Sequence, residues 1–156
     1  MLYVFFGPDS FSRREALQQL KAELGGDGML EAGTVTFDAR QVTPQEVIAA
    51  CDTLPFLSSH RLVIVEGILQ HTAAPARPGR PPGGRARRRS PRSPAADPWL
   101  ALAGYVDRMP PTTTLVLLDG DAPAQSPLLD ALRGKGSLRP FRPPARRALP
   151  DWIQRR

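Results

Sequence analysis

The fold of this chain is decided by the stretch Thr53-Leu-Pro-Phe-Leu-Ser-Ser-His-Arg-Leu-Val-Ile-Val-Glu66. Its last part, from Leu62 to Val65, is an unbroken apolar run of strand length, which is typical of a strand buried on both faces. Before it, the loop that should turn toward water carries bulky apolar residues: Leu54, Pro55, Phe56 and Leu57. Because a compact group of exposed apolar side chains often marks a protein-binding surface, this loop tip is a candidate partner site.

Apolar strands alternate with amphipathic helices along the rest of the chain. Strands are predicted at residues 2–6, 34–37, 62–65, 114–118 and 137–141. Helices are predicted after Asp9 or Ser10, at the capping box Thr43-Pro-Gln-Glu46, after Asp97 and after Ser126. This alternation indicates a mostly parallel sheet. We therefore expect a three-layer α/β domain with helices on both faces of the sheet.

One segment, at about residues 73–96, does not fit this pattern. It consists of Ala, Pro, Gly, Arg and Ser and has no large apolar residue, although the chain as a whole is 41% hydrophobic. Such a composition cannot bury enough surface to offset the entropy lost on ordering. We therefore expect a disordered insertion within a single domain that spans residues 1–148.

The basic charge of the chain is concentrated in that insertion. Removing its seven arginines from the net charge of +6 leaves −1 for the remainder. Two interpretations stay open, a solvated linker or nonspecific contact with nucleic-acid phosphates. The segment lacks the aromatic residues that would stack on bases. Any DNA contact would use these side chains: Arg77, Arg80, Arg85, Arg87, Arg88, Arg89 and Arg92.

The first strand–helix turn does not have the composition of a phosphate-binding loop. It contains Gly7-Pro-Asp9, in which the proline has no N–H to donate and the aspartate would repel a phosphate. The phosphate loop G-x-x-x-x-G-K-[ST] and the dinucleotide fingerprint G-x-G-x-x-G are both absent. Nucleotide binding is therefore not expected, and no cofactor is predicted.

The other candidates for chemistry have simpler explanations. Glu66 and Asp119 each follow an apolar strand, which is the position of a magnesium ligand in nucleotide-binding proteins. Because the chain has no phosphate loop for such a metal to serve, we interpret both residues as strand ends that face solvent. His60 and His71 have no partners at zinc-ligand spacing, and Cys51 lies on the apolar face of a helix. No catalytic residue and no metal site are predicted.

The composition also indicates the cellular compartment in which the protein acts. A single cysteine excludes an internal disulfide and is usual in a reducing cytosol. No signal peptide is visible, and no apolar run approaches the roughly 20 residues of a membrane span. We expect a cytoplasmic protein without membrane contact.

Five segments, in order, resemble the delta subunit of bacterial DNA polymerase III, a clamp-loader protein. The first is Met1-Leu-Tyr-Val-Phe-Phe-Gly-Pro-Asp-Ser-Phe-Ser-Arg-Arg-Glu-Ala-Leu17, in which a strand runs into Gly-x-Asp-x-Phe and then into a helix. Phe37-Asp38 closes the second strand, and the stretch from Leu54 to Glu66 follows. The others are Pro110-Pro-Thr-Thr-Thr-Leu-Val-Leu118 and Leu149-Pro-Asp-Trp-Ile153.

This resemblance implies an AAA+-like domain that has lost ATP binding. In that family, apolar residues at the tip before the third strand enter a pocket on the sliding clamp, the beta subunit, and favour its open form. Carried over by position, the plug is Phe56, helped by Leu54, Pro55 and Leu57. Pro55 departs from the family, because some members have a second large aliphatic residue there. Which of the three accompanies Phe56 stays open, and so does the alternative that Phe56 is a core residue of its own domain.

The resemblance implies a clamp-loader subunit of the polymerase III holoenzyme that acts in DNA replication. The chain itself is expected to have no catalytic site, because the DNA-directed DNA polymerase (transferase) activity belongs to the holoenzyme. Family members continue into helical domains that join the other loader subunits. We therefore expect residues 149–156 to begin a linker helix, and the chain to be a fragment or a truncated form. The alternative is a small α/β nucleotide-dependent enzyme or regulator with an unrecognised phosphate site.

Overall fold

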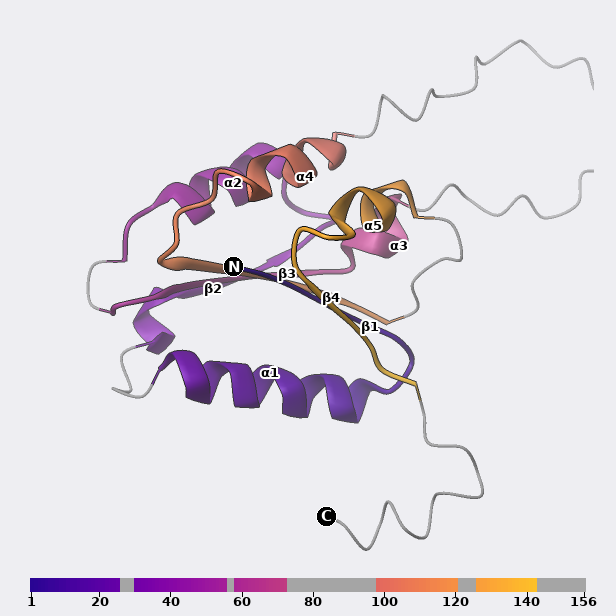
Figure 1. Cartoon of the computed structure of the whole chain (residues 1–156), viewed down its shortest axis with the longest axis horizontal. Helices are drawn as coiled ribbons and strands as arrows, with labels where there is room; N and C mark the ends of the chain where they lie inside the picture. Colours follow the sequence, from indigo (N-terminus) through magenta and orange to yellow (C-terminus); the bar gives the residue numbers. More distant parts are fainter. Residues whose placement is uncertain (26–29, 56–57, 73–97, 121–125, 143–156) are drawn as a thin grey trace, which may run out of the picture.

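The computed structural model describes residues 1–25, 30–55, 58–72, 98–120 and 126–142. In these residues, five parallel strands form one sheet in the order β2-β3-β4-β1-β5 (Figure 1). The strands are β1 (Leu2–Phe6), β2 (Thr34–Asp38), β3 (Arg61–Glu66), β4 (Thr113–Asp119) and β5 (Ser137–Pro140). Each predicted strand is present, with boundaries that agree within one residue.

The sheet is buried on both faces because side chains along each central strand alternate between two apolar cores. On β3, Val63 and Val65 belong to one core, whereas Leu62 and Ile64 belong to the other. Val63 lies beside Leu115 of β4, which belongs to the same core. An unbroken apolar run is therefore needed here, since both faces of the strand are covered.

Helices form the two outer layers (Figure 1). They are α1 (Ser10–Leu24), α2 (Pro44–Asp52), α3 (Ile68–Thr72), α4 (Leu100–Val106) and α5 (Pro127–Leu132), with a short 3-10 helix η1 (Leu30–Gly33) before β2. α1 covers one face of the sheet, and α2, α3, α4 and α5 cover the other. The predicted three-layer α/β arrangement is confirmed.

The predicted helix starts have local capping side chains. The Asp9 carboxylate accepts the N–H of Ser12 at 3.0 Å, and the Ser126 hydroxyl accepts the N–H of Leu129 at 3.2 Å. Asx and Ser side chains in this position satisfy N–H groups that have no partner inside the helix. The chain therefore enters α1 and α5 at the residues that the sequence indicates.

Two helices differ from the prediction. α4 begins at Leu100, after a turn at residues 98 and 99, whereas the sequence placed its start directly after Asp97. α3 was not predicted, since it has only five residues and follows Gly67 directly. Asp97, the insertion at about 73–96 and the segment 149–156 lie outside the described residues. In the described ranges, no helix has the length and apolar character needed to cross a membrane.

Candidate functional site

The candidate partner site lies where α2 ends and the chain turns toward β3. Leu54 follows the helix end by two residues, and 73% of its surface is exposed. Pro55 is half-buried. Phe56 and Leu57 lie outside the described residues. The structure therefore places one large apolar side chain of the predicted tip in solvent, where it is available to a partner.

α2 is positioned by one apolar face and by a local cap. Val47 and Cys51 are fully buried against the sheet. At the start of the helix, Thr43 donates its N–H to the carboxylate of Glu46 at 2.7 Å, and its hydroxyl accepts the N–H of Glu46 at 3.3 Å. The N–H of Thr43 and its hydroxyl both donate to the Glu46 carboxylate, and these two hydrogen bonds lower the pKa of Glu46. The predicted capping box is therefore formed.

The other end of α2 is attached to distant elements. Thr113 on β4 donates its hydroxyl to the C=O of Cys51 at 2.8 Å, and Tyr105 on α4 donates its hydroxyl to Asp52 Oδ1 at 2.5 Å. The last carbonyl groups of a helix have no partner within it, and Thr113 satisfies that of Cys51. Tyr105 holds the same helix end through the side chain of Asp52. Leu54 thus leaves from a helix end that is fixed to the sheet and to α4.

Burial keeps two groups near this helix end in their protonated forms. It raises the pKa of Tyr105 far above its usual value, and the hydrogen bond to Asp52 acts in the same direction. Burial also raises the pKa of the Cys51 thiol to about 12, with a smaller contribution from the charge of Asp52. Tyr105 therefore remains a hydrogen-bond donor at neutral pH, and Cys51 is the buried core residue that the sequence predicted.

The chain returns to the sheet through residues 58–60. Ser58 donates its hydroxyl to the C=O of His60 at 2.5 Å. A Cβ at Gly33, the last residue of η1, would lie 2.6 Å from the Ser58 hydroxyl oxygen and 3.0 Å from the His60 carbonyl oxygen. A larger residue at position 33 would displace the returning segment, so η1 helps to set the path of the loop.

The turn after β1 uses its own N–H groups inside the fold. Gly7 donates to the C=O of Gly120 at 2.5 Å, and Asp9 donates to the C=O of Phe141 at 3.3 Å. The proline between them has no N–H, and the Asp9 carboxylate caps the start of α1. A bound phosphate would need these donors and this helix start. Because these N–H groups and the helix start are already used within the fold, they do not favour a phosphate site at this turn.

The two acidic residues that follow apolar strands have different surroundings. Glu66 is exposed, as the sequence indicated. Asp119 is only 1% exposed, so the interpretation as a solvent-facing strand end is wrong for it. Its carboxylate accepts the N–H groups of Leu69 at 3.0 Å and Gln70 at 3.3 Å, at the start of α3. Asp119 therefore caps a helix that lies about 50 residues earlier in the chain.

Burial and the nearby Arg13 both affect the carboxylate of Asp119. Burial raises the pKa of Asp119 to about 6, although the N–H groups of Leu69 and Gln70 and the charge of Arg13 oppose the rise. The guanidinium Nη1 of Arg13 donates to the backbone C=O of Asp119 at 2.5 Å. Sequence analysis missed these interactions, since no local pattern relates α1 to the end of β4.

A cavity of about 550 Å³ lies at the carboxyl ends of β2, β3 and β4, beside the first turns of α1. Ligands of open parallel sheets bind at this edge. Its charged lining residues have both signs: Arg13, Arg14, Arg40, Asp38 and Glu66. Three positive and two negative groups nearly cancel, unlike the cationic lining that a triphosphate needs. In the part of the chain that the structure describes, no group of three or more His, Cys, Asp or Glu side chains is placed to hold a metal ion.

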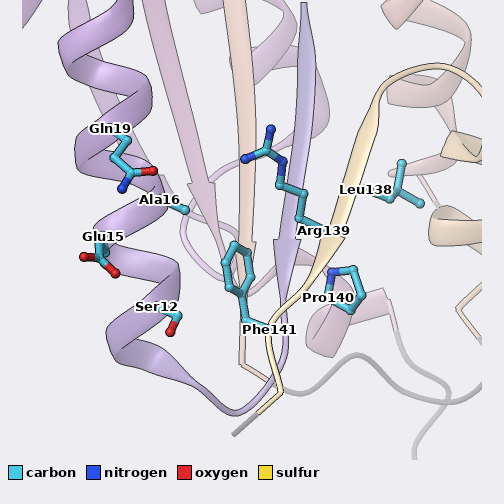
Figure 2. A pocket seen from close by; sticks show the side chains of 8 residues that line it. All are labelled: Ser12, Glu15, Ala16, Gln19, Leu138, Arg139, Pro140 and Phe141. Carbon is cyan, nitrogen blue, oxygen red and sulfur yellow. The ribbon is translucent and has the colours of Figure 1, made fainter. Parts of the chain in front are cut away.

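A second hollow, of about 450 Å³, lies between α1 and the edge strand β5 (Figure 2). Arg139 and Phe141 point to the α1 side of β5, whereas Leu138 and Pro140 point away from it. The Phe141 ring meets the Phe5 ring edge-to-face, with centroids 5.5 Å apart. This hollow adjoins the carboxyl end of β5, whereas the loop with Leu54 precedes the amino end of β3, so in a parallel sheet the two sites are separate.

Comparison with a protein family supports the resemblance seen in the sequence. The sequence model of the family described as DNA polymerase III, delta subunit, matches residues 3–74. This segment runs from β1 through α3 and contains the whole loop between α2 and β3. Among curated proteins, no sequence match is found.

Comparison with solved structures agrees. The chain is similar to the DNA clamp loader delta protein (YqeN) of Bacillus subtilis, with a TM-score of 0.67 and 18% sequence identity. The similarity covers 97% of this chain and 41% of that protein, so the chain spans less than half of its length. At this identity the match shows the fold, which is α/β and AAA+-like, as the resemblance implied. Over residues 3–74 the chain is therefore similar to the delta subunit family of DNA polymerase III.

Proposed function

We propose that this chain acts as a clamp-loader subunit in DNA replication, and that its loop tip at residues 54–57 binds the sliding clamp and helps to open it. The observation that carries the proposal is the exposure of Leu54 at the end of a helix that is fixed to the fold. The loop also lies inside the segment that matches the delta subunit family.

The chemistry of the tip suits a protein partner. An exposed leucine beside a proline and a phenylalanine offers apolar anchors to a preformed pocket, and such anchors usually contribute most of the binding energy of an interface. To open a ring, the tip must bind the open form more tightly than the closed form, because only differential affinity shifts an equilibrium. Leu54, Pro55, Phe56 and Leu57 are the residues proposed to make this contact.

The proposal includes a division of the chain. Residues 1–148 are proposed to form the AAA+-like domain, with the Arg- and Pro-rich segment at about 73–96 as an insertion that is not needed for clamp binding. Any DNA contact is assigned to the arginines of that insertion, and contacts with other clamp-loader subunits are expected in the cytoplasm, where replication proceeds. The domain supplies a binding surface and no catalytic group.

The alternative, a nucleotide-dependent enzyme, has no observation in its favour among the described residues. The N–H groups of Gly7 and Asp9 are bonded within the fold, and the Asp9 carboxylate occupies the start of α1. The cavity at the carboxyl edge of the sheet has charges of both signs. The clamp-binding proposal is therefore preferred.

The test is binding of the full chain to the sliding clamp by surface plasmon resonance. Leu54→Ala is expected to weaken binding by about tenfold, as for a typical anchor residue. Phe11→Ala is a matched control, because Phe11 is also a large apolar residue and is 55% exposed. Phe11 lies in the first turn of α1, at the carboxyl ends of the strands, whereas Leu54 lies before the amino end of β3. Its affinity should change by less than about twofold. Equal losses in both variants would contradict a contact centred on the tip.

A further inference from the structure

Arg61 joins the two sides of the loop that carries Leu54. Its backbone belongs to β3, where its N–H donates to the C=O of Thr112 at 2.9 Å. Its side chain crosses to α2, where Nε donates to the C=O of Ala50 at 2.5 Å. One residue at the end of the loop thus holds the helix from which the loop begins.

The position of this contact on α2 is specific. Ala50 lies in the last turn of the helix, two residues before its end and four before Leu54. The next carbonyl, that of Cys51, accepts the hydroxyl of Thr113, and the Asp52 side chain accepts that of Tyr105. Donors from β3, β4 and α4 therefore converge on the turn that precedes the exposed leucine.

The start of the same helix is held differently. Its cap consists of Thr43 and Glu46, which are three residues apart and interact at an exposed position. The described side-chain hydrogen bonds from distant elements to α2 all reach its last turn, at residues 50–52. Packing alone would not require this asymmetry, because the apolar face of α2 extends along its length, with Val47 buried as deeply as Cys51.

We propose that Arg61 is a positioning residue for clamp binding: its hydrogen bond to Ala50 fixes the end of α2 against β3, so that Leu54 leaves the helix in one direction. This inference rests on the proposed function. A loop whose two ends are held in place loses less conformational freedom when it binds, so its affinity is higher without any contact between Arg61 and the partner.

Three substitutions separate positioning from the other possible roles of Arg61. Arg61→Ala removes the donor and the charge together. Arg61→Gln removes the charge but keeps an amide nitrogen at the same number of bonds from Cα as Nε, so it can still donate to Ala50. Arg133→Ala is the matched control, because Arg133 is an exposed arginine whose ion pair with Asp130 at 3.3 Å lies on the surface of the molecule.

The expected result is that Arg61→Ala weakens clamp binding by about tenfold, while Arg61→Gln and Arg133→Ala stay within about threefold of wild type. The affinities are compared at a temperature where circular dichroism shows every variant folded. An Arg61→Gln variant as weak as Arg61→Ala would indicate a direct charge contact and would overturn the positioning role.

A double-mutant cycle with Leu54→Ala tests whether Arg61 acts through the tip. If it does, Arg61→Ala costs less than about threefold in the Leu54→Ala background, because the side chain that it positions is already gone. Fully additive losses would show that Arg61 acts independently of Leu54, which contradicts the inference.

A measurement without the clamp keeps this inference distinct from the proposed function. The methyl order parameters of Leu54, from NMR relaxation of the full chain, should fall in Arg61→Ala and recover in Arg61→Gln. If wild type fails to bind the clamp, the proposed function fails, and these order parameters still decide whether Arg61 orders the loop. Order parameters that are equal in all three proteins would overturn the positioning role.

Discussion

The carboxylate of Asp119, at the end of β4, accepts the N–H of Leu69, at the start of α3, across 3.0 Å. The two residues come from segments that are 50 positions apart. Next to this cap, Gly67 donates its N–H to the C=O of Leu118 at 2.9 Å. α3 is thus held at its first turn by β4, and a five-residue helix that would be unstable alone is kept in place.

Asp119→Asn should change how stability depends on pH. Burial raises the pKa of Asp119 from 3.8 to about 6, so between these values the folded state holds a proton that the unfolded state has lost. The contribution of Asp119 to the free energy of unfolding therefore falls as the pH rises from about 4 to about 6, and is constant above.

Asparagine does not titrate, so the difference in unfolding free energy between variant and wild type should shift in favour of the variant by on the order of 2 kcal/mol between about pH 4 and pH 7. Urea unfolding followed by circular dichroism measures this difference. A difference that stays constant over this range would show that Asp119 titrates normally.

Gly7→Ala should strongly destabilise the domain. Gly7 has a φ of +128°, and a Cβ there would lie 2.0 Å from the carbonyl oxygen of Phe141. The expected loss is about 2 kcal/mol or more, because both the backbone conformation and the space exclude a side chain. The matched control is Gly104→Ala in α4, where a Cβ meets nothing within 4 Å. It should raise stability by about 0.5–1 kcal/mol, because alanine favours helix. Similar losses in both variants would contradict the close approach at Gly7.

Cys51 should react with thiol reagents only after unfolding. The side chain is fully buried, and the pKa of its thiol is raised to about 12, so almost no thiolate forms near neutral pH. Labelling with a coloured disulfide reagent at about pH 8 should be at least about a hundredfold slower in the folded chain than in urea. Rapid labelling without denaturant would place Cys51 outside the core.

ATP with magnesium should not change the melting temperature of the chain. The donors of the turn at Gly7 and Asp9 are used within the fold, so no phosphate site is available there. A ligand that binds only the native state would raise the melting temperature in a saturable way. Such a rise, if abolished by Arg14→Ala in the cavity at the carboxyl edge of the sheet, would favour the nucleotide-dependent alternative.

Deleting residues 73–96 should leave clamp binding unchanged within about twofold, because the proposed contact lies at residues 54–57.

The same deletion should abolish any DNA affinity, because it removes the seven arginines of that segment, and phosphate contacts by arginine carry nonspecific binding. Fluorescence anisotropy with labelled duplex DNA, at low and at physiological salt, measures both the affinity and its salt dependence. Unchanged DNA binding after the deletion would move that contact to the rest of the chain.

Features with local signals were predictable from the sequence. The capping box at Thr43 and Glu46 starts α2, and the apolar run from Leu62 to Val65 forms a central strand. Leu54 is exposed, as its position in the loop between a predicted helix and a predicted strand indicated. In each case, neighbouring residues supply the determining interaction, so their spacing is visible in the chain.

Features that depend on distant partners were not predictable. The cap of α3 comes from Asp119, and the last turn of α2 is held by Arg61, Tyr105 and Thr113. Tyr105 is 53 residues from Asp52, and Thr113 is 62 residues from Cys51. Only the folded sheet brings these groups together, so no periodicity or motif in a single sequence marks them.

The most direct test of the proposed function is the affinity of the full chain for the sliding clamp, measured for wild type and for Phe56→Ala with the fold of each checked by circular dichroism. Phe56 is the residue to which the family resemblance assigns the plug. We expect wild type to bind, and a folded Phe56→Ala variant to bind at least about tenfold more weakly. A folded wild-type chain that does not bind the clamp would contradict the proposed function.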